Sequence, residues 1–416
     1  MIYSAILWRR AFLRLVVQSI AAMALLASCA TSPENTKLVS TPVKDTLRAT
    51  PPSASSVQSP RKGATSANLD VKIGQMLMVG FRGLEVDNEH FIVQDIRKRH
   101  LGGVVLFDYD VPTQQPVRNI ESPSQVKALI ASLKSASATP LLVAIDQEGG
   151  IVARLKERHG FPPTVSHYHL GEFNDHETTH KQATLVAKTL ADLGINLNLA
   201  PVVDLCANPD NPIIPKYERC FSADPLIVTD HALQFIRAHH QQEVLCALKH
   251  FPGHGSSTGD SHLGLTDVTN KWARVELEPY VRIIKVGQAD AIMTAHVFNA
   301  NLDNQYPATL SEVTITGILR DELNYDGVVI SDDLQMGAIV NHYGFETAIQ
   351  KAIEAGVDIL AFANNSVYEE DAAGRAIKVI SELVQAGTIS EARIDESYRR
   401  IQRLKRRLPA SLAGRP

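Results

Sequence analysis

A chain of 416 residues, of which 44% are hydrophobic and 21% charged, has the composition of a globular protein with a large core. Its formal charge of −4 at pH 7 shows no basic excess, which argues against a nucleic-acid partner. The length suits either one large α/β domain or two ordinary domains.

The first 28 residues have the layout of a secretory signal peptide. Arg9, Arg10 and Arg14 precede an apolar run over 15–26, which is shorter than the roughly 20 residues of a membrane span. An uncleaved membrane anchor is the alternative. The end of this segment, "LASC", resembles the lipobox of bacterial lipoproteins, in which the enzyme cuts before the cysteine. We therefore expect Cys29 to carry lipid and to anchor the exported protein to the cell envelope. Ala30, by the same resemblance, favours the periplasmic face of the outer membrane.

A polar segment comes next. Residues 30–68 are rich in Ser, Thr, Pro and Ala and contain no aromatic residue, which is typical of a disordered tether. We expect residues 29–68 to link the anchor to a folded domain over 69–408, followed by a tail over 409–416. In that domain Cys206 and Cys220 could form a disulfide bond, but free thiols at both and at Cys246 explain the sequence equally well.

From about Leu69, short apolar runs alternate with amphipathic stretches. The runs predict eight buried strands, over 76–81, 102–107, 141–146, 195–204, 246–251, 291–296, 327–332 and 357–363. Helical spacing is clear over 124–136, 180–194, 273–287, 370–387 and 390–408, and Pro279 indicates a kink or a later helix start. This alternation predicts a single (β/α)8 barrel. An open doubly wound sheet is the alternative, but "GFRG" after the first strand does not match its dinucleotide motif.

Polar residues stand where several of these strands end, which is where a (β/α)8 barrel builds its active site. They are Asp146, Asp204, Lys249 with His250, His296 and Asp332. Asp332 and Asp333 are adjacent carboxylates, so we expect them to point in different directions, and spacing alone does not say which faces the pocket.

The fifth strand continues into the loop "KHFPGHGSSTGDSH", residues 249–262, whose glycines allow it to close over a ligand. Asp260 and His262 lie two residues apart and share one side of an extended segment. The carboxylate can therefore orient the imidazole, which exchanges protons near neutral pH.

The motifs of this domain resemble those of the glycoside hydrolase family 3 β-N-acetylglucosaminidases, and most closely the single-domain bacterial form that processes peptidoglycan fragments. The resemblance covers nearly all of residues 69–408. It rests on "DQEGG" (146–150), "KHFPGHG" (249–255), "DSHLGL" (260–265), "MTAH" (293–296), "PATLS" (307–311) and "SDDLQM" (331–336).

The resemblance implies a retaining hydrolase of terminal β-linked N-acetylglucosamine that needs neither cofactor nor metal. Asp332 would be the nucleophile, and His262, supported by Asp260, the acid/base. The positions that would bind the sugar are Asp146, Arg219, Lys249 and His250. The substrate would be a peptidoglycan fragment or a chitooligosaccharide.

Some positions depart from the family pattern and leave the aglycone and the sugar preference open. Ile151 stands in place of the usual arginine, Ser256 and Ser257 in place of Asp-Thr, and Cys220 in place of serine. About 50 residues follow the eighth strand and read as helices. We therefore expect the acid to come from the loops of the barrel itself.

Three other functions fit parts of the sequence. "HETTH" (176–180) matches a zinc motif, and the strand-end histidines could also hold a metal, although Lys249 would repel a cation. A family 3 β-glucosidase or a phosphorylase would share the barrel and the nucleophile. A lipoprotein that binds the cell wall without catalysis is the third alternative.

Overall fold

The computed structural model describes residues 67–409. The predicted signal peptide, Cys29 and nearly all of the predicted tether lie outside the described residues, as does most of the predicted tail. None of the helices within 67–409 is long and apolar enough to cross a membrane.

Eight parallel strands form the centre of the domain, and the predicted single (β/α)8 barrel is confirmed. Their order in the sheet is β10-β1-β2-β3-β4-β5-β7-β9. The edge strands meet through a parallel bridge between Ile330 and Ile359, where the Ser331 N–H donates to the Ile359 carbonyl at 2.9 Å. The strands are β1 (Leu77–Gly80), β2 (Gly103–Leu106), β3 (Leu142–Ile145), β4 (Leu197–Asn198), β5 (Leu245–Phe251), β7 (Ala291–Thr294), β9 (Val328–Ile330) and β10 (Leu360–Phe362).

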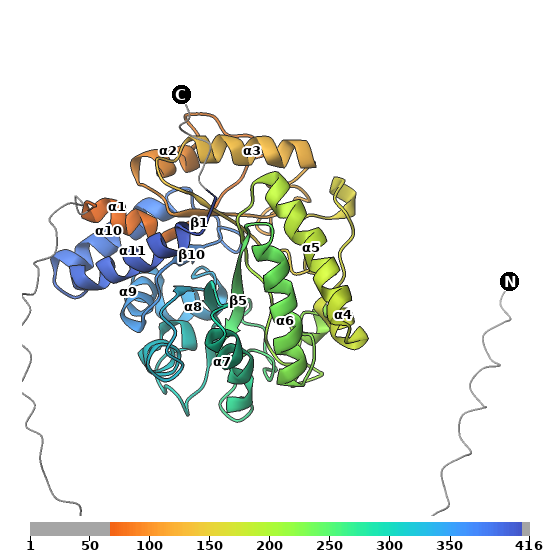
Figure 1. Ribbon diagram of the computed structural model, residues 1–416. Helices are drawn as coiled ribbons and strands as arrows, with labels where there is room; N and C mark the ends of the chain where they lie inside the picture. The colour runs from red at the N-terminus through yellow and green to blue at the C-terminus, as the bar shows by residue number, and fades with distance from the viewer. Residues whose placement is uncertain (1–66, 410–416) are drawn as a thin grey trace, which may run out of the picture. The chain divides into compact units, whose positions relative to one another are not determined.

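Helices cover the outside of the barrel, with α5 and α6 side by side (Figure 1). Each of the five predicted helical stretches is found. The α-helices are α1 (Leu69–Gln75), α2 (Phe91–Lys98), α3 (Pro123–Ser135), α4 (His167–Phe173), α5 (His176–Leu193), α6 (Pro225–His240), α7 (Glu278–Lys285), α8 (Gly337–Tyr343), α9 (Phe345–Ala355), α10 (Ala372–Gln385) and α11 (Glu391–Lys405). The shorter elements are the 3₁₀ turns η1 (Glu157–His159), η2 (Pro215–Tyr217), η3 (Arg274–Leu277) and η4 (Ala308–Leu310), the π-helix η5 (Val313–Glu322), and a two-stranded parallel sheet of β6 (Thr266–Asp267) and β8 (Val297–Phe298).

Local sequence sets the helix boundaries. Asp175 caps α5 by accepting hydrogen bonds from the Glu177 and Thr178 N–H groups, and Gly194 ends the helix at φ +90°. Pro279 lies in the first turn of α7, so the stretch predicted over 273–287 begins as the 3₁₀ turn η3 and becomes α-helical only at Glu278.

The fourth strand is shorter than predicted. Of residues 195–204, only Leu197–Asn198 form β4, because Pro201 has no N–H to contribute to a ladder. The chain then returns to the sheet beside β5, where the Val203 N–H donates to the Lys249 carbonyl at 2.8 Å. Asp204 therefore lies next to β5 and does not end a strand.

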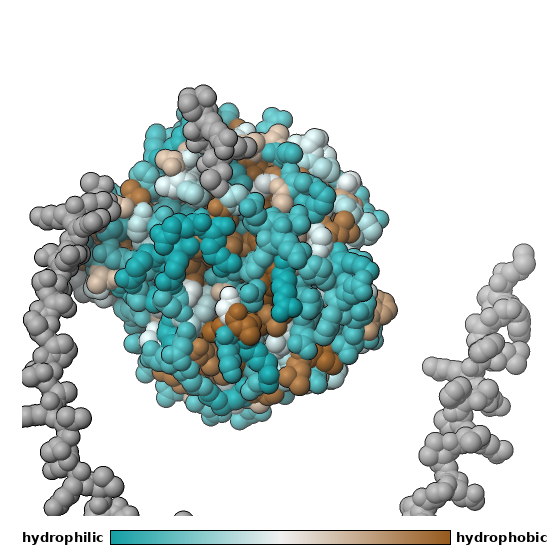
Figure 2. All heavy atoms as spheres, in the orientation of Figure 1, coloured by the Kyte–Doolittle hydropathy of each residue, from teal (hydrophilic) through white to brown (hydrophobic). Residues whose placement is uncertain are grey.

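The residues of the eight barrel strands are buried, and their apolar side chains belong to one continuous core. Asn198, Lys249, His250 and Thr294 are the buried polar residues of these strands. The face of the molecule in Figure 2 is hydrophilic over most of its area, with apolar residues in smaller areas between. The core therefore lies inside the ring of helices, and the polar strand ends provide the natural place for a site.

Candidate active site

Two acids and two cations form the floor of the site: Glu148 and Lys249 are buried, and Asp146 and Arg219 are mostly buried. The Lys249 ammonium contacts Asp146 Oδ1 at 2.7 Å and Glu148 Oε1 at 2.8 Å, and only 2% of the Lys249 side chain is exposed. Arg219 binds Glu148 with two hydrogen bonds, at 2.9 Å from Nε and 2.8 Å from Nη2. The structure thus brings together three of the predicted sugar-binding residues.

Both acids of this floor are ionised because their cations outweigh the effect of burial. Burial alone would raise the pKa of Asp146, but Lys249 and Arg154 lower it to about 2. Arg219 and Lys249 likewise hold the pKa of Glu148 well below its usual value, against the effect of its burial. The site therefore offers fixed charges and hydrogen-bonding groups near the ends of β3 and β5.

Two members of this network were not predicted. Glu148 lies two residues after Asp146 in "DQEGG", and that spacing on one side of an extended segment was the available signal. Arg154 reaches Asp146 Oδ2 with its Nη2 at 3.2 Å, because the bridge between Gly149 and Val152 turns the chain back. Its Nε is buried and has no hydrogen-bond partner among the described residues.

His250 is held at both ring nitrogens. Nδ1 donates to Asp204 Oδ2 at 2.6 Å, and Arg219 Nη2 donates to Nε2 at 3.1 Å. This arrangement selects the tautomer with hydrogen on Nδ1. Asp204 also accepts the His254 N–H at 2.8 Å, so one carboxylate orients both the imidazole and the start of the glycine-rich loop.

The two adjacent aspartates of "SDD" have different environments. Asp333 accepts the N–H groups of Gln335 at 3.1 Å and Ala363 at 3.0 Å, and burial raises its pKa to about 6. It ties the loop after β9 to the end of β10. Burial would also raise the pKa of Asp332, but nearby imidazoles, with His296 the strongest, lower it below its usual value. Asp332 is therefore the ionised carboxylate that faces the histidines.

Asp260 and His262 form a hydrogen-bonded pair in the loop above this floor. Asp260 Oδ1 accepts the His262 Nδ1–H at 2.7 Å and the His262 main-chain N–H at 2.9 Å. His262 Nε2 has no hydrogen-bond partner among the described residues, and 58% of the side chain is exposed. The hydrogen bond to Asp260, with the charge of Asp332, raises the pKa of His262.

The other two histidines of the site hold the structure in place. His254 contacts Ser257 Oγ at 2.8 Å through Nδ1 and Ser261 Oγ at 3.3 Å through Nε2, and burial lowers its pKa to about 4. His296 contacts Thr309 Oγ1 at 2.8 Å and donates from Nε2 to the Asp333 carbonyl at 2.9 Å. His254 thus holds two residues of the glycine-rich loop, and His296 holds the backbone next to Asp332.

Cys206 and Cys220 form a disulfide bond, with their Cα atoms 5.5 Å apart, and Cys246 is a buried free thiol. The bridge decides between the two interpretations that the sequence left open. Cys220 directly follows Arg219, and Cys206 comes two residues after Asp204, so the bridge adjoins the residues that hold His250.

The zinc-like motif lies elsewhere, in the first turns of α5. Glu177 pairs with Lys181, and the His176 ring packs against His231 with centroids 5.1 Å apart. Within residues 67–409, no three His, Cys, Asp or Glu side chains are grouped as metal ligands would be.

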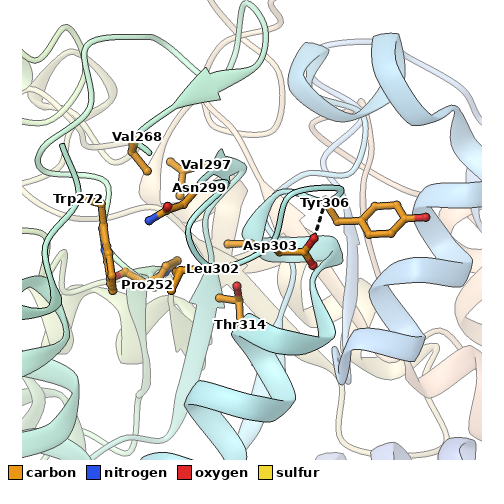
Figure 3. Close-up of a pocket in the computed structure, with 10 residues that line it drawn as sticks. Pro252, Val268, Trp272, Val297, Asn299, Leu302, Asp303, Tyr306 and Thr314 are labelled. Carbon is orange, nitrogen blue, oxygen red and sulfur yellow. Dashed lines mark hydrogen bonds between the residues drawn. The ribbon is translucent and has the colours of Figure 1, made fainter. Parts of the chain in front are cut away.

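A small crevice lies outside the site, near the end of β5 (Figure 3). Pro252, Trp272 and Tyr306 are among its lining residues, and the Trp272 indole N–H donates to the Pro252 carbonyl at 3.1 Å. Its one carboxylate, Asp303, accepts the Tyr306 N–H at 3.1 Å. The crevice holds none of the candidate catalytic groups.

Comparison with known proteins matches residues 68–404 to the model of the glycosyl hydrolase family 3 N-terminal domain. The chain is 33% identical over 350 residues to beta-hexosaminidase A of Pseudoalteromonas piscicida, covering 77% of this chain and 55% of that protein. It is 35% identical over 292 residues to the beta-hexosaminidase of Tolumonas auensis, covering 70% of this chain and 83% of that protein.

Among solved structures, the fold is similar to a glycoside hydrolase family 3 beta-N-acetylglucosaminidase from Paenibacillus, with a TM-score of 0.76 and 35% identity. The match covers 84% of this chain and 65% of that chain. The chain thus spans about half to two thirds of some relatives and most of others.

Proposed function

The chain belongs to glycosyl hydrolase family 3, and we propose that it removes terminal β-linked N-acetylglucosamine from peptidoglycan fragments or chitooligosaccharides. The observation that supports this most directly is the pairing of an ionised carboxylate, Asp332, with a hydrogen-bonded Asp260–His262 pair whose outer nitrogen is free. An anionic nucleophile and a separate proton donor are what a retaining glycosidase needs.

Asp332 is the proposed nucleophile. Its pKa is below the usual value, so it is ionised at neutral pH and can attack the anomeric carbon. The glycosidic C–O bond breaks as the glycosyl-Asp332 ester forms, and water later cleaves the ester. The Asp332 N–H donates to Thr294 Oγ1 at 3.3 Å, which helps to fix the residue at the end of β9.

His262 is the proposed acid/base. The raised pKa favours the protonated imidazole, which donates its Nε2 proton to the leaving oxygen and then accepts a proton from the attacking water. Asp260 keeps Nδ1 protonated, so Nε2 is the nitrogen that exchanges the proton. The exposed position of His262 suits a group that must reach the glycosidic oxygen of a bound substrate.

The sugar hydroxyls are proposed to bind the charged floor. Asp146 and Lys249 can accept and donate hydrogen bonds there, and Arg219 and His250 extend the same surface. Arg154 contacts Asp146 Oδ2 at 3.2 Å with its Nη2 and so helps to keep that carboxylate ionised and in place.

The first experiment compares hydrolysis of 4-nitrophenyl N-acetyl-β-glucosaminide with that of the matching β-glucoside. We expect release from the N-acetyl compound and little from the glucoside. Preference for the glucoside would favour the β-glucosidase, and formation of a sugar 1-phosphate with added phosphate would favour the phosphorylase. If folded protein releases 4-nitrophenol from neither compound, the result would favour a lipoprotein that binds the cell wall without catalysis.

We also propose that the enzyme is exported and lipid-anchored at Cys29, on the periplasmic face of the outer membrane. The charged start, the apolar run and "LASC" support this. The test is metabolic labelling with a palmitate analogue, followed by membrane fractionation. Label on the wild type and none on Cys29→Ala is expected; equal labelling, or activity only in the cytoplasm, would contradict the anchor.

A further inference from the structure

We propose that the Cys206–Cys220 disulfide bond positions Arg219 and His250 for sugar binding, so that full substrate affinity requires an oxidising compartment. The inference rests on the proposed function, because it assigns the two residues to the sugar-binding floor. It concerns neither the nucleophile nor the acid/base.

Both ends of the bridged segment adjoin groups that hold one imidazole. Asp204, two residues before Cys206, accepts the His250 Nδ1–H at 2.6 Å. Arg219, directly before Cys220, donates to His250 Nε2 at 3.1 Å. The disulfide bond thus joins, through very short lengths of chain, the two partners that fix His250 from opposite sides.

The bridge is also the centre of the local packing. Ile213, Ile214 and Cys220 form a small buried cluster separate from the main core, and Cys206 packs against it. The turn η2 between them has no buried residue of its own. Leu205 and Phe221, the neighbours of the two cysteines in the chain, are instead buried in the main core.

Polar contacts from outside the segment hold both of its halves. In the first half, the Asn211 side chain donates to the His254 carbonyl at 2.8 Å and the Asn208 side chain to the Ser257 carbonyl at 2.7 Å. In the second half, His167 Nδ1 donates to the Arg219 carbonyl at 3.0 Å and the Tyr168 N–H donates to the Glu218 carbonyl at 3.1 Å. The bridge adds a covalent link between the two ends, next to the hydrogen bond from the Cys206 N–H to the Ser222 carbonyl at 2.8 Å.

Displacement of Arg219 would affect binding more than chemistry. Glu148 would keep Lys249 as its cation but lose the two hydrogen bonds from the guanidinium. His250 would lose its partner at Nε2, while Asp332, Asp260 and His262 keep their own contacts. Contacts that bind substrate and transition state alike raise KM when lost and leave kcat nearly unchanged.

The test measures kcat and KM on 4-nitrophenyl N-acetyl-β-glucosaminide for the full chain, oxidised and after reduction, with the state of the cysteines read by alkylation and mass spectrometry. Reduction should raise KM roughly tenfold or more and change kcat less than about twofold. The double variant Cys206→Ser/Cys220→Ser should match the reduced wild type and ignore reductant. Cys246→Ala, which lacks only the free thiol, should respond as the wild type does.

A double-mutant cycle separates positioning from general destabilisation. Arg219→Ala should raise KM by itself, and reduction should then add little, because the bridge acts through that side chain. Three results would overturn the inference. The first is an unchanged KM in protein whose bridge is shown to be open, and the second is an effect of reduction on kcat and KM that is the same in Arg219→Ala as in the wild type. The third is the finding that Cys206 and Cys220 are unpaired in the exported protein. If the double variant does not fold, reduction of the folded wild type decides. An oxidised wild type with no activity on the substrate would instead overturn the proposed function, and this inference with it.

Discussion

Replacing Glu276 with glutamine should stabilise the protein at neutral and alkaline pH. Glu276 lies in η3 beneath the glycine-rich loop, with 1% of its surface exposed. Its Oε2 accepts the Gly255 N–H at 3.1 Å, and Oε1 has no partner among the described residues. Burial is the main reason that its pKa rises from 4.5 to about 7.

The size of the effect follows from that shift. The unfolded chain loses the proton near pH 4.5 and the folded protein only near pH 7, so the folded state binds more protons in between. The stability of the wild type is therefore full below pH 4.5 and decreases as pH rises to about 7. At ~1.4 kcal/mol per pKa unit, the shift corresponds to ~3 kcal/mol above pH 7. Glutamine is neutral throughout and keeps an oxygen for the Gly255 N–H.

The assay is urea unfolding of wild type and Glu276→Gln at several pH values between 5 and 8. The difference in unfolding free energy should grow with pH to ~3 kcal/mol in favour of the variant. Glu278→Gln is the matched control, because that side chain is 43% exposed two residues away. Parallel curves for wild type and Glu276→Gln across this range would refute the reasoning.

Further predictions concern the reacting groups and the loop that carries one of them. Asp332→Asn should lower kcat on the order of 10⁴-fold or more with an unchanged circular dichroism spectrum; substantial turnover would remove Asp332 as nucleophile. His262→Ala should slow substrates with poor leaving groups by roughly 10²–10⁴-fold and activated aryl glycosides far less, and equal slowing of both would contradict the acid role. Asp260→Ala removes the hydrogen bond that raises the pKa of His262, so the alkaline limb of the kcat–pH profile should move to lower pH; an unmoved limb would argue against the pair. Gly255→Ala would place a Cβ 1.8 Å from a backbone carbonyl of the β4–α6 loop and should cost ~1–3 kcal/mol of stability along with activity, whereas a Cβ at Gly264 meets nothing within 4 Å and serves as the control in thermal unfolding.

The barrel could be predicted from the sequence because each strand is a continuous apolar run that the fold buries on both faces. Residues 142–145 and 328–330 illustrate this, since every residue in them is buried. The length of β4 could not be predicted in the same way. Residues 195–204 are mostly apolar, although Asn196, Asn198 and Asp204 are among them. Their apolar character reflects burial against β5 and says nothing about the ladder, which Pro201 interrupts.

Spacing along the chain predicted partners close in sequence and missed those that only the fold brings together. The Asp260–His262 contact spans two residues. Asp333 is distinguished from Asp332 by its hydrogen bond from the Ala363 N–H, which lies 30 residues farther along the chain. Glu148 and Arg219, which form hydrogen bonds with each other, are 71 residues apart. The cysteine pairing was open for a similar reason, because nothing in the residues themselves says that the loop between Cys206 and Cys220 closes.

The charges in the site are arranged so that the two proposed catalytic groups favour each other's required protonation state. The cations Lys249 and Arg219 form ion pairs with Asp146 and Glu148 and so neutralise the charges of those two acids. The groups that lower the pKa of Asp332 are therefore mainly the imidazoles. The charge of Asp332 contributes to the raised pKa of His262, and the charge of His262 contributes to the lowered pKa of Asp332. An ionised nucleophile with a protonated acid is the state that begins the reaction. Once the glycosyl-enzyme forms, Asp332 loses its charge and His262 loses that support, so its pKa falls and it becomes the better base for the second step.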